Sequence, residues 1–384
     1  MTNKVLFTAS TFSHILNFHV PYLKWFRDRG WSVHVACGGE PAPIPDVDRV
    51  VVLPLKKSMA STENLRAAAL LRRLIRKEAY DLISTHTSLA AFFTRLAVKG
   101  MRQRPLVVNT VHGYLFDGDA SAVKRRILLL AERMTAAQTD LLMTMTQWDF
   151  QLAQKEKLGR RVVHIPGMGV DFSRLEGYGS SDGLALRRKW GIPDKAFVMI
   201  YPAEFSGRKS QAVLIRAMTK LPAGCVLVLP GQGALLEECR AMARQLELTG
   251  RVIFPGQVVG MGPWYAAADA AVSASRSEGL PFNVMEAMHC GLPVVASRVK
   301  GHTDLIRDGA AGLLYPYGNA DACAAAIRSL MNSASLRREL GRSAKENAEQ
   351  YSLERVLPEI VRRYSELLSE TGTVKMSEIT KQVL

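Results

Sequence analysis

Residues 270–297 read AAVSASRSEGLPFNVMEAMHCGLPVVAS, and this stretch indicates the class of fold. The short apolar runs 270–273 and 293–296 each predict a buried strand. Between them, SEGLPFNVMEA follows the first strand and opens a helix, with Pro281 in the first helical turn, where its missing N–H costs nothing. A strand, a helix and a second strand in this order form a βαβ unit of a parallel sheet.

The same alternation of β-branched runs and amphipathic segments extends along the chain in both directions. The first half predicts strands over residues 5–9, 32–36, 50–53, 82–85, 106–110, 141–145 and 162–165. The second half predicts strands over residues 197–201, 225–229, 252–254, 270–273, 293–296 and 312–315. Crossover helices are predicted at 21–28, 63–78, 89–99 and 122–137. We therefore predict an α/β protein with two doubly wound, Rossmann-like domains in tandem.

A break in this alternation marks the expected domain boundary. Residues 166–182, PGMGVDFSRLEGYGSSD, are rich in Gly, Ser and charged residues, a composition typical of a linker. We place an N-terminal domain at 1–170 and a C-terminal domain at 171–384, the latter including the helical segment after Asn319. Open parallel sheets bind ligands at the carboxyl ends of their strands, so we expect the site in a cleft that the two sheets face.

The composition is that of an ordinary globular protein, with 48% hydrophobic and 22% charged residues. No apolar run approaches the roughly 18 residues of a membrane-spanning helix, and the N-terminus lacks a signal-peptide core. Five scattered cysteines without a CxxC pair suit a reducing compartment and small buried side chains. We expect a cytoplasmic protein.

Lys and Arg exceed Asp and Glu by 50 − 35 = 15, which predicts attraction to a polyanion such as nucleic acid or anionic lipid. No nucleic-acid-binding motif is present, so no nucleic-acid partner is expected. Residues 124–133, KRRILLLAER, combine a cationic start with an apolar helical face, as interfacial helices do. A crossover helix whose leucines pack on the sheet explains the same pattern equally well. We keep both interpretations.

Two glutamates flank the start of the helix in SEGLPFNVMEA. Free N–H groups at a helix N-terminus favour an anion such as a diphosphate. Glu278 and Glu286 would repel that anion, so their expected partners are the hydroxyl groups of a sugar or a ribose. The structural alternative is that Glu278 is an acid favoured by the helix dipole and Glu286 a solvated helix residue.

SEGLPFNVMEAMHCGLPVVAS resembles the Glu-x7-Glu segment of retaining GT-B glycosyltransferases of family 4. The resemblance extends over essentially the whole chain. It includes VLVLPGQG at 226–233, VIFPG at 252–256, YAAAD at 265–269 and GAAGLL at 309–314. The opening SHILNFHVPYLKWFRDRGWSVHVA and VHGYLF at 111–116 are similar to the branch that builds capsular polysaccharide and exopolysaccharide.

The resemblance implies roles for the residues of the second domain. Glu286 would hold the ribose of a nucleotide sugar, and catalytic Glu278 would contact the transferred sugar. The backbone contacts to that sugar would come from Gly279, Leu280, Pro281 and Phe282. Gly231 and Gly233 would let the chain approach the nucleotide diphosphate.

Lys209 matches the lysine that neutralises the departing diphosphate in the family, a role that no metal motif fills here. Arg208 would add a second positive charge. Many relatives carry an arginine a few residues before the lysine, where this chain has Glu204. As an alternative, Arg208 and Lys209 are a solvated helix start.

In the first domain, His112 follows a predicted strand and matches the family histidine that contacts the transferred sugar. We assign it, with Lys209 and Glu278, to catalysis. His14 and His19 follow the first strand, where the acceptor would approach. Many relatives have a Gly-Gly loop at Ser13 to Ile15, and its replacement alters the expected acceptor contacts.

Asp117-Gly118-Asp119 has the form of an Asp-x-Asp metal site, but a polar turn that caps a helix is the favoured interpretation. No G-x-G-x-x-G follows the first strand, and neither a P-loop nor a zinc-ligand cluster is visible in the sequence. We expect no metal and no cofactor.

The function that the resemblance implies is retaining transfer of a hexose or an N-acetylhexosamine from a UDP-sugar. The acceptor would be a polyprenyl-diphosphate-linked saccharide in surface polysaccharide synthesis. The enzyme would be peripheral at the inner face of the cell membrane, bound to its anionic surface. Two alternatives are a nucleotide-sugar epimerase of the same fold and a non-catalytic nucleic-acid-binding protein, which would bind with steep salt dependence.

Overall fold

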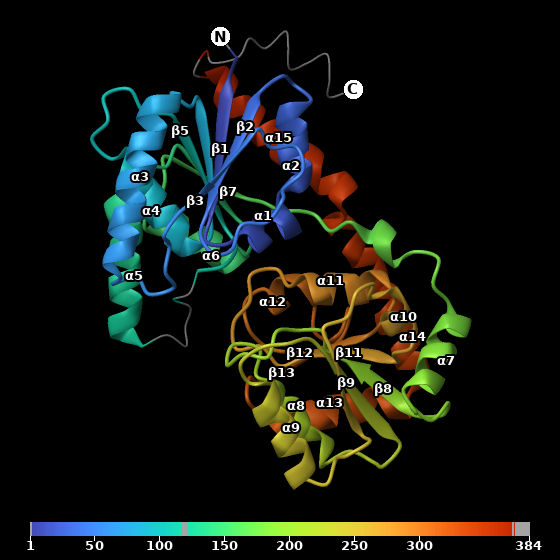
Figure 1. The fold of residues 1–384 in the computed structure, drawn as a ribbon. Helices are drawn as coiled ribbons and strands as arrows, with labels where there is room; N and C mark the ends of the chain where they lie inside the picture. Colours follow the sequence, from blue (N-terminus) through green and yellow to red (C-terminus); the bar gives the residue numbers. More distant parts are fainter. Residues whose placement is uncertain (1, 115, 117–120, 371, 373–384) are drawn as a thin grey trace. The chain divides into compact units, whose positions relative to one another are not determined.

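The computed structural model describes the chain except for residues 1, 115, 117–120, 371 and 373–384. The chain divides into two compact units (Figure 1). The first contains Met1–Gly169 and returns with Glu354–Leu384, and the second is Val170–Leu353.

The first unit has a seven-stranded parallel sheet in the order β3-β2-β1-β4-β5-β6-β7. Its strands are β1 (Lys4–Ala9), β2 (Ser32–Cys37), β3 (Arg49–Val52), β4 (Leu82–His86), β5 (Leu106–Val111), β6 (Leu141–Thr144) and β7 (Arg161–His164). Its helices are α1 (Phe12–Phe18), α2 (Val20–Arg27), α3 (Thr62–Glu78), α4 (Ser88–Val98), α5 (Ala122–Thr135), the 3-10 turn Ala136–Gln138, α6 (Gln147–Lys155) and α15 (Leu353–Glu370).

The second unit has a six-stranded parallel sheet in the order β10-β9-β8-β11-β12-β13. Its strands are β8 (Phe197–Ile200), β9 (Cys225–Pro230), β10 (Val252–Gly256), β11 (Ala270–Ser273), β12 (Val294–Ser297) and β13 (Leu313–Tyr315). Its helices are α7 (Ser180–Lys189), α8 (Gln211–Met218), α9 (Leu236–Gln245), α10 (Gly262–Ala266), α11 (Phe282–His289), α12 (His302–Leu305), α13 (Ala320–Asn332) and α14 (Ala334–Ala348), with 3-10 turns at Phe172–Leu175 and Glu349–Tyr351.

These sheets confirm the predicted pair of doubly wound domains, and each predicted strand overlaps an observed one. In each sheet the strand order reverses beside the first strand, between β1 and β4 and between β8 and β11. Loops that leave neighbouring strands at such a reversal diverge to opposite faces and leave room for a ligand. The reversal therefore marks the candidate site in each unit.

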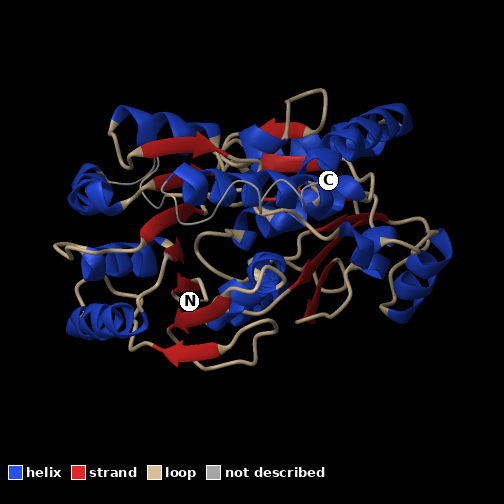
Figure 2. Ribbon diagram, turned by 90° about the horizontal axis from the view of Figure 1, so that it is seen from above, coloured by secondary structure: helices blue, strands red, loops and turns tan. Residues whose placement is uncertain are grey.

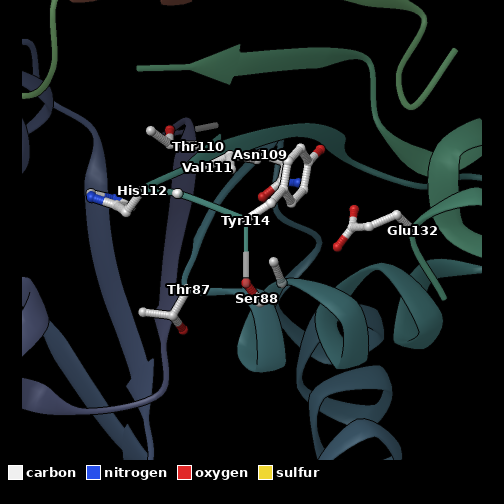
Figure 3. Close-up of a pocket in the computed structure, with 10 residues that line it drawn as sticks. Thr87, Ser88, Asn109, Thr110, Val111, His112, Tyr114 and Glu132 are labelled. Carbon is white, nitrogen blue, oxygen red and sulfur yellow. The ribbon is translucent and has the colours of Figure 1, made fainter. Parts of the chain in front are cut away.

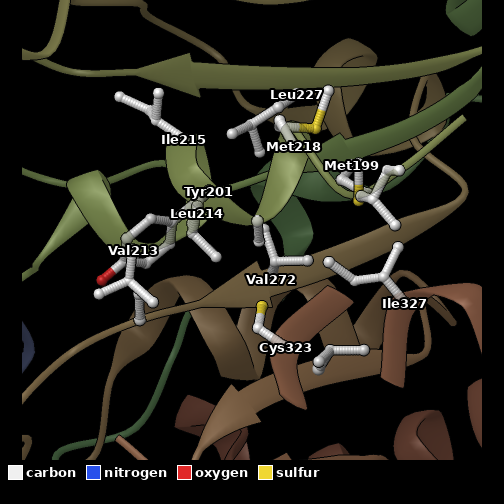
Figure 4. Close-up of a cluster of buried hydrophobic side chains, with 14 of the residues drawn as sticks. Met199, Tyr201, Val213, Leu214, Ile215, Met218, Leu227, Val272, Cys323 and Ile327 are labelled. Carbon is white, nitrogen blue, oxygen red and sulfur yellow. The ribbon is translucent and has the colours of Figure 1, made fainter. Parts of the chain in front are cut away.

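Alternate side chains of the second sheet pack on opposite faces, as the period of a strand requires. Met199, Tyr201, Leu227 and Val272 pack with α8 and α13, and Figure 4 shows these side chains gathered with Ile327. Val198, Ile200 and Val226 belong to the core on the other face, with side chains from α10 and α11. Burial on both faces explains why these strands are continuous apolar runs.

The first sheet is covered in the same way, with α3 and α4 on one face and α2 and α15 on the other (Figure 1). Figure 2 distinguishes the helices, in blue, from the strands, in red. All five cysteines are free, and all but the half-buried Cys290 are buried, as expected. No helix within the described residues is long and apolar enough to cross a bilayer.

The structure corrects the expected domain limits. The C-terminal helix α15 belongs to the first unit, not to the second. Its Tyr364 packs edge-on against Phe26, with ring centroids 5.4 Å apart, and its hydroxyl lies 2.7 Å from the Ser84 hydroxyl. Arg161 of β7 donates to Glu366 at 2.8 Å. The amphipathic face of α15 therefore completes the core of the first unit.

The segment expected to be a linker is also packed. Val170, Phe172 and Leu175 are buried in the core of the second unit. Val170 N–H donates to the carbonyl of Tyr351. Glycine and charged residues around these three apolar side chains concealed their spacing.

We predict that Tyr364→Ala destabilises the first unit by about 3–5 kcal/mol, because a large buried aromatic ring is removed. Tyr364→Phe keeps the ring and loses one buried hydrogen bond, at a cost of about 1 kcal/mol. Urea unfolding with hydrogen exchange of β1 and β4 measures both effects. Arg355→Ala, on the exposed side of the same helix, is the control and should cost less than about 0.5 kcal/mol. Equal protection of β1 in Tyr364→Ala and wild type would contradict the assignment of α15 to this unit.

Candidate functional site

The second unit carries a carboxylate–cation cluster, made of Arg208, Lys209 and Glu278, at its strand-order reversal. Arg208 and Lys209 follow β8, and Glu278 follows β11. Lys209 Nζ lies 2.5 Å from Glu278 Oε1, and Arg208 Nη1 lies 2.8 Å from Oε2. The backbone N–H of Arg276 donates to the carbonyl of Arg208 and joins the two loops. The structure thus brings together three of the predicted site residues.

The Glu278 carboxylate is held from several sides. The Ser275 hydroxyl donates to Oε1 at 2.5 Å, and the Tyr201 hydroxyl lies 2.7 Å from the Ser275 hydroxyl. Burial alone would raise the pKa of Glu278, but the charges of Lys209 and Arg208 outweigh it and lower the pKa to about 2. Glu278 is ionised at neutral pH, and the cluster carries a net charge of about +1.

A buried histidine that the sequence analysis missed lies behind this cluster. His302 begins α12, and its Nε2 lies 3.0 Å from the Ser273 hydroxyl. Its Nδ1 lies 2.8 Å from the carbonyl of Ser297. Burial lowers the pKa of His302, so the ring is neutral at neutral pH. His302 follows β12, the strand next to β11, and that position was the available signal.

The two glycines of the 230–233 loop have a packing role in the structure. A Cβ at Gly231 would lie 2.1 Å from the carbonyl oxygen of Ala203, and one at Gly233 would lie 2.4 Å from that of Phe205. Both glycines have positive φ, at 144° and 150°. Because these glycines have no side chain, the loop can lie directly against the backbone of residues 203–205, which leads to Arg208 and Lys209. That these glycines also let the backbone approach a nucleotide diphosphate stays a prediction.

Helix α11 follows Glu278 after one short loop. The structure places Pro281 at the N-cap and begins the helix at Phe282, so Pro281 lies just before the first helical turn that we had predicted for it. The preceding loop is tight, because a Cβ at Gly301 would lie 1.7 Å from the carbonyl oxygen of Gly279. Pro281 is buried, and Gly279, Leu280 and Phe282 are half-buried.

Glu286 is half-buried on α11, and the Tyr265 hydroxyl donates to its Oε2 at 2.8 Å. Burial raises the pKa of Glu286, although this hydrogen bond lowers it. Tyr265 was not among the predicted site residues. It lies in the YAAAD segment at 265–269, and its contact fixes the orientation of the Glu286 carboxylate.

The first unit carries a histidine cluster, made of His14, His19, His86 and His112, at its own strand-order reversal. His112 Nε2 lies 3.3 Å from His14 Nε2 and 3.5 Å from His86 Nδ1. The rings of His19 and His86 have centroids 3.6 Å apart. The sequence analysis predicted three of these residues and missed His86. His86 ends β4, the strand beside β1, so the rule that carboxyl ends meet at one edge of a sheet would have found it.

Burial lowers the pKa of every histidine in the cluster. The pKa of His14 falls to about 4. Those of His19, His86 and His112 fall well below the ordinary value, first because of burial and then because neighbouring imidazoles repel a second positive charge. All four rings are therefore neutral at neutral pH.

A small pocket adjoins the backbone of His112 (Figure 3). It is lined on its other side by Tyr114 and Glu132, and Figure 3 shows the His112 ring projecting away from both. Glu132 accepts a 2.9 Å hydrogen bond from the buried Arg95 and so ties α5 to α4. The pocket therefore lies among the buried residues that support the histidine cluster from the interior of the first unit. Asp117 and Asp119, considered as a metal site from the sequence, lie outside the described residues.

We predict that the stability difference between wild type and Glu278→Gln depends on pH. The folded-state pKa of Glu278 lies below its unfolded value. Its ionised form therefore stabilises the fold fully above about pH 5, and this contribution is lost as the pH falls toward 2. The difference in unfolding free energy should shrink by about 3 kcal/mol over that range. Denaturant unfolding at several pH values measures it.

Glu237→Gln, on an exposed ion pair, is the matched control and should show no comparable trend. A pH-independent difference for Glu278→Gln would mean that the ion pairs do not form in solution.

Two family models match the chain. The model described as "Glycosyl transferases group 1" matches residues 184–347, and the model described as "Glycosyl transferase 4-like domain" matches residues 21–167. EpsD of Bacillus subtilis (strain 168), provisionally named as a glycosyltransferase, is 33% identical over 371 residues. The match covers 95% of this chain and 97% of EpsD.

Solved structures share the fold. Anabaena HepE in complex with UDP and glucose superposes with a TM-score of 0.78 at 22% identity, over 95% of this chain and 100% of HepE. Sucrose-phosphate synthase from Thermosynechococcus elongatus gives a TM-score of 0.80 at 19% identity, over 96% and 100% of the two chains. These matches confirm the predicted GT-B fold of two Rossmann-like domains.

Proposed function

Since the chain belongs to the group 1 glycosyltransferases and carries their 4-like domain, we propose that it transfers a sugar from a UDP-sugar to a polyprenyl-diphosphate-linked saccharide during exopolysaccharide synthesis. Transfer would retain the anomeric configuration. The observation that carries the proposal is the carboxylate–cation cluster at the β8–β11 reversal. The similarity to EpsD and to HepE, whose solved structure is a complex with UDP and glucose, supports it.

The cluster suits a diphosphate leaving group. Lys209 and Arg208 are already held side by side by Glu278, so two cations meet the diphosphate without further ordering. When the diphosphate binds, it shares these cations, and Glu278 can accept hydrogen bonds from hydroxyls of the transferred sugar. Tyr265 holds one oxygen of Glu286, which leaves the other oxygen for the ribose hydroxyls that we assign to it. Mg²⁺ and Mn²⁺ are not needed for this chemistry.

The histidine cluster supports the assignment of the first unit to acceptor binding. His112 and His14 are half-buried with neutral rings, so each can exchange a hydrogen bond with a hydroxyl group. We assign His112 to the transferred sugar and His14 to the acceptor side. His19, which we had expected to contact the acceptor, is fully buried and supports the other rings from within. A hexose or an N-acetylhexosamine fits this chemistry equally.

We predict that a UDP-release screen across nucleotide sugars, with membrane extract as acceptor and no added Mg²⁺ or Mn²⁺, identifies a donor. Lys209→Ala should lower kcat about 10²- to 10³-fold, because leaving-group stabilisation is lost. Lys220→Ala, which removes an exposed lysine, is the matched control and should keep full activity. Conversion of the UDP-sugar into its epimer without net UDP release would favour the epimerase alternative. A rate restored only by Mg²⁺ or Mn²⁺ would overturn the metal-free mechanism.

Helix α5 supports attachment to an anionic membrane surface. Val123, Ile127, Leu130 and Met134 are 68%, 62%, 58% and 49% exposed and recur at one helical face. Glu132 lies on the opposite, buried face. Beside this apolar stripe, α5 carries four exposed basic residues: Lys124, Arg125, Arg126 and Arg133. An apolar stripe with cationic neighbours is the pattern of an interfacial helix, and it favours this interpretation over a fully packed crossover helix.

We predict reversible binding to vesicles that contain phosphatidylglycerol. A triple glutamine variant of Lys124, Arg125 and Arg126 should bind less, since each basic residue contributes about 1 kcal/mol near an anionic surface. Ile127→Ser should weaken binding at high salt, where the apolar contribution remains. Co-sedimentation at low and high salt measures both.

A triple glutamine variant of Arg338, Arg342 and Lys345, exposed on α14, is the charge-matched control and should sediment like wild type. If both triple variants lose binding equally, the overall charge and not α5 is responsible.

A further inference from the structure

The histidine cluster has one feature that sugar binding does not explain. His19 is fully buried, and neither of its ring nitrogens has a hydrogen-bond partner among the described residues. Burying a polar ring without partners is unfavourable. The ring is held there by packing against the tilted ring of His86 and by its place at the junction of α1 and α2, where the backbone of His19 ends α1.

The His19 ring faces two other imidazoles. One ligand nitrogen from each of His14, His19 and His112 lies within 4.8 Å of the other two. Among the described residues, no other group of three or more histidine, cysteine, aspartate or glutamate side chains brings its ligand atoms this close together. Three nitrogen ligands, from helix α1, the α1–α2 junction and the loop after β5, form the donor set of a transition-metal site.

We propose that His14, His19 and His112 bind one Zn²⁺ ion through one ring nitrogen each.

The distances support this assignment. With Zn–N bonds of about 2.0–2.1 Å, two nitrogens of a tetrahedral site lie about 3.3–3.4 Å apart. His14 Nε2 and His112 Nε2 already lie 3.3 Å apart. Since all three nitrogens lie within 4.8 Å of one another, a movement of His19 by up to about 1.5 Å closes the triangle.

The chemistry favours Zn²⁺ over Mg²⁺ or Ca²⁺. Imidazole nitrogens suit zinc and similar transition metals, whereas Mg²⁺ and Ca²⁺ prefer oxygen ligands. His14 and His112 are half-buried, which leaves a fourth position open to water or to a ligand oxygen.

His86 packs behind the three ligands. Its ring centroid lies 3.6 Å from that of His19, and its Nε2 lies 3.0 Å from the Ser84 hydroxyl. Ser84 in turn contacts Tyr364 of α15. This packing holds the buried His19 ring in place.

The proposal concerns ion binding and does not depend on the sugar transfer proposed above. The test uses the full chain with any polyhistidine tag removed, stripped of metal by dialysis, and without nucleotide sugar, because His112 is also assigned to the transferred sugar. Calorimetric titration with Zn²⁺ should give one ion per chain. Co²⁺ in place of Zn²⁺ should give the strong visible absorption of a tetrahedral site.

His14→Gln and His112→Gln should each lower Zn²⁺ affinity at least about 100-fold. His14 is half-buried, so His14→Gln should stay folded, and circular dichroism checks this. His164→Ala, which removes an exposed histidine of the same unit, is the matched control and should bind like wild type. No binding by wild type, or binding that survives His14→Gln and His112→Gln unchanged, would overturn the proposal.

Discussion

The candidate site depends on the parallel pairing of two strands, β8 and β11, whose connections leave in opposite directions. This pairing brings Lys209 within 2.5 Å of Glu278 although 69 residues separate them. An ammonium group and a carboxylate that are both largely removed from water stabilise each other only in good geometry. The hydroxyl of Ser275 and the guanidinium of Arg208 supply the remaining partners of the carboxylate. The fold thus holds in place a charged group that would otherwise be costly to bury.

The two units share one strand topology but present different side chains at the strand-order reversal. Both sheets have the order 3-2-1-4-5-6, and the first adds a seventh strand. At the reversal in the second unit, the loops present cations and a carboxylate, which suit a charged leaving group. At the reversal in the first unit, they present neutral imidazoles, which suit hydroxyl groups or a metal ion. Fold and function are therefore separable in this chain, since the chemistry lies in the loops and the strands only position them.

Helix α15 shows how a distant segment supports a site. Tyr364 contacts Ser84, Ser84 contacts His86, and the His86 ring packs against that of His19. This series of contacts joins residues more than 300 positions apart in sequence to one cluster of rings. The C-terminal helix thus contributes to the histidine cluster without reaching it.

The sequence alone determined the two sheets, because each strand is a short apolar run whose burial on both faces leaves a local pattern. It also indicated Lys209, Glu278 and His112, through the resemblance of their segments to a known family and, for His112, through its place directly after a predicted strand. Short helices with little periodicity were not predicted, and α1, which carries His14, is one of them. So was the packing of Phe172 and Leu175, which glycine and charged neighbours concealed.

Only the tertiary structure decided which side chains meet. The pairing of Glu278 with two cations, the place of His86 beside His112, and the return of α15 to the first unit all depend on contacts between distant parts of the chain. Periodicity reports which face of a segment is buried, but not against what it is buried. That choice is made by packing free energy summed over the whole unit, and no local stretch of residues carries it.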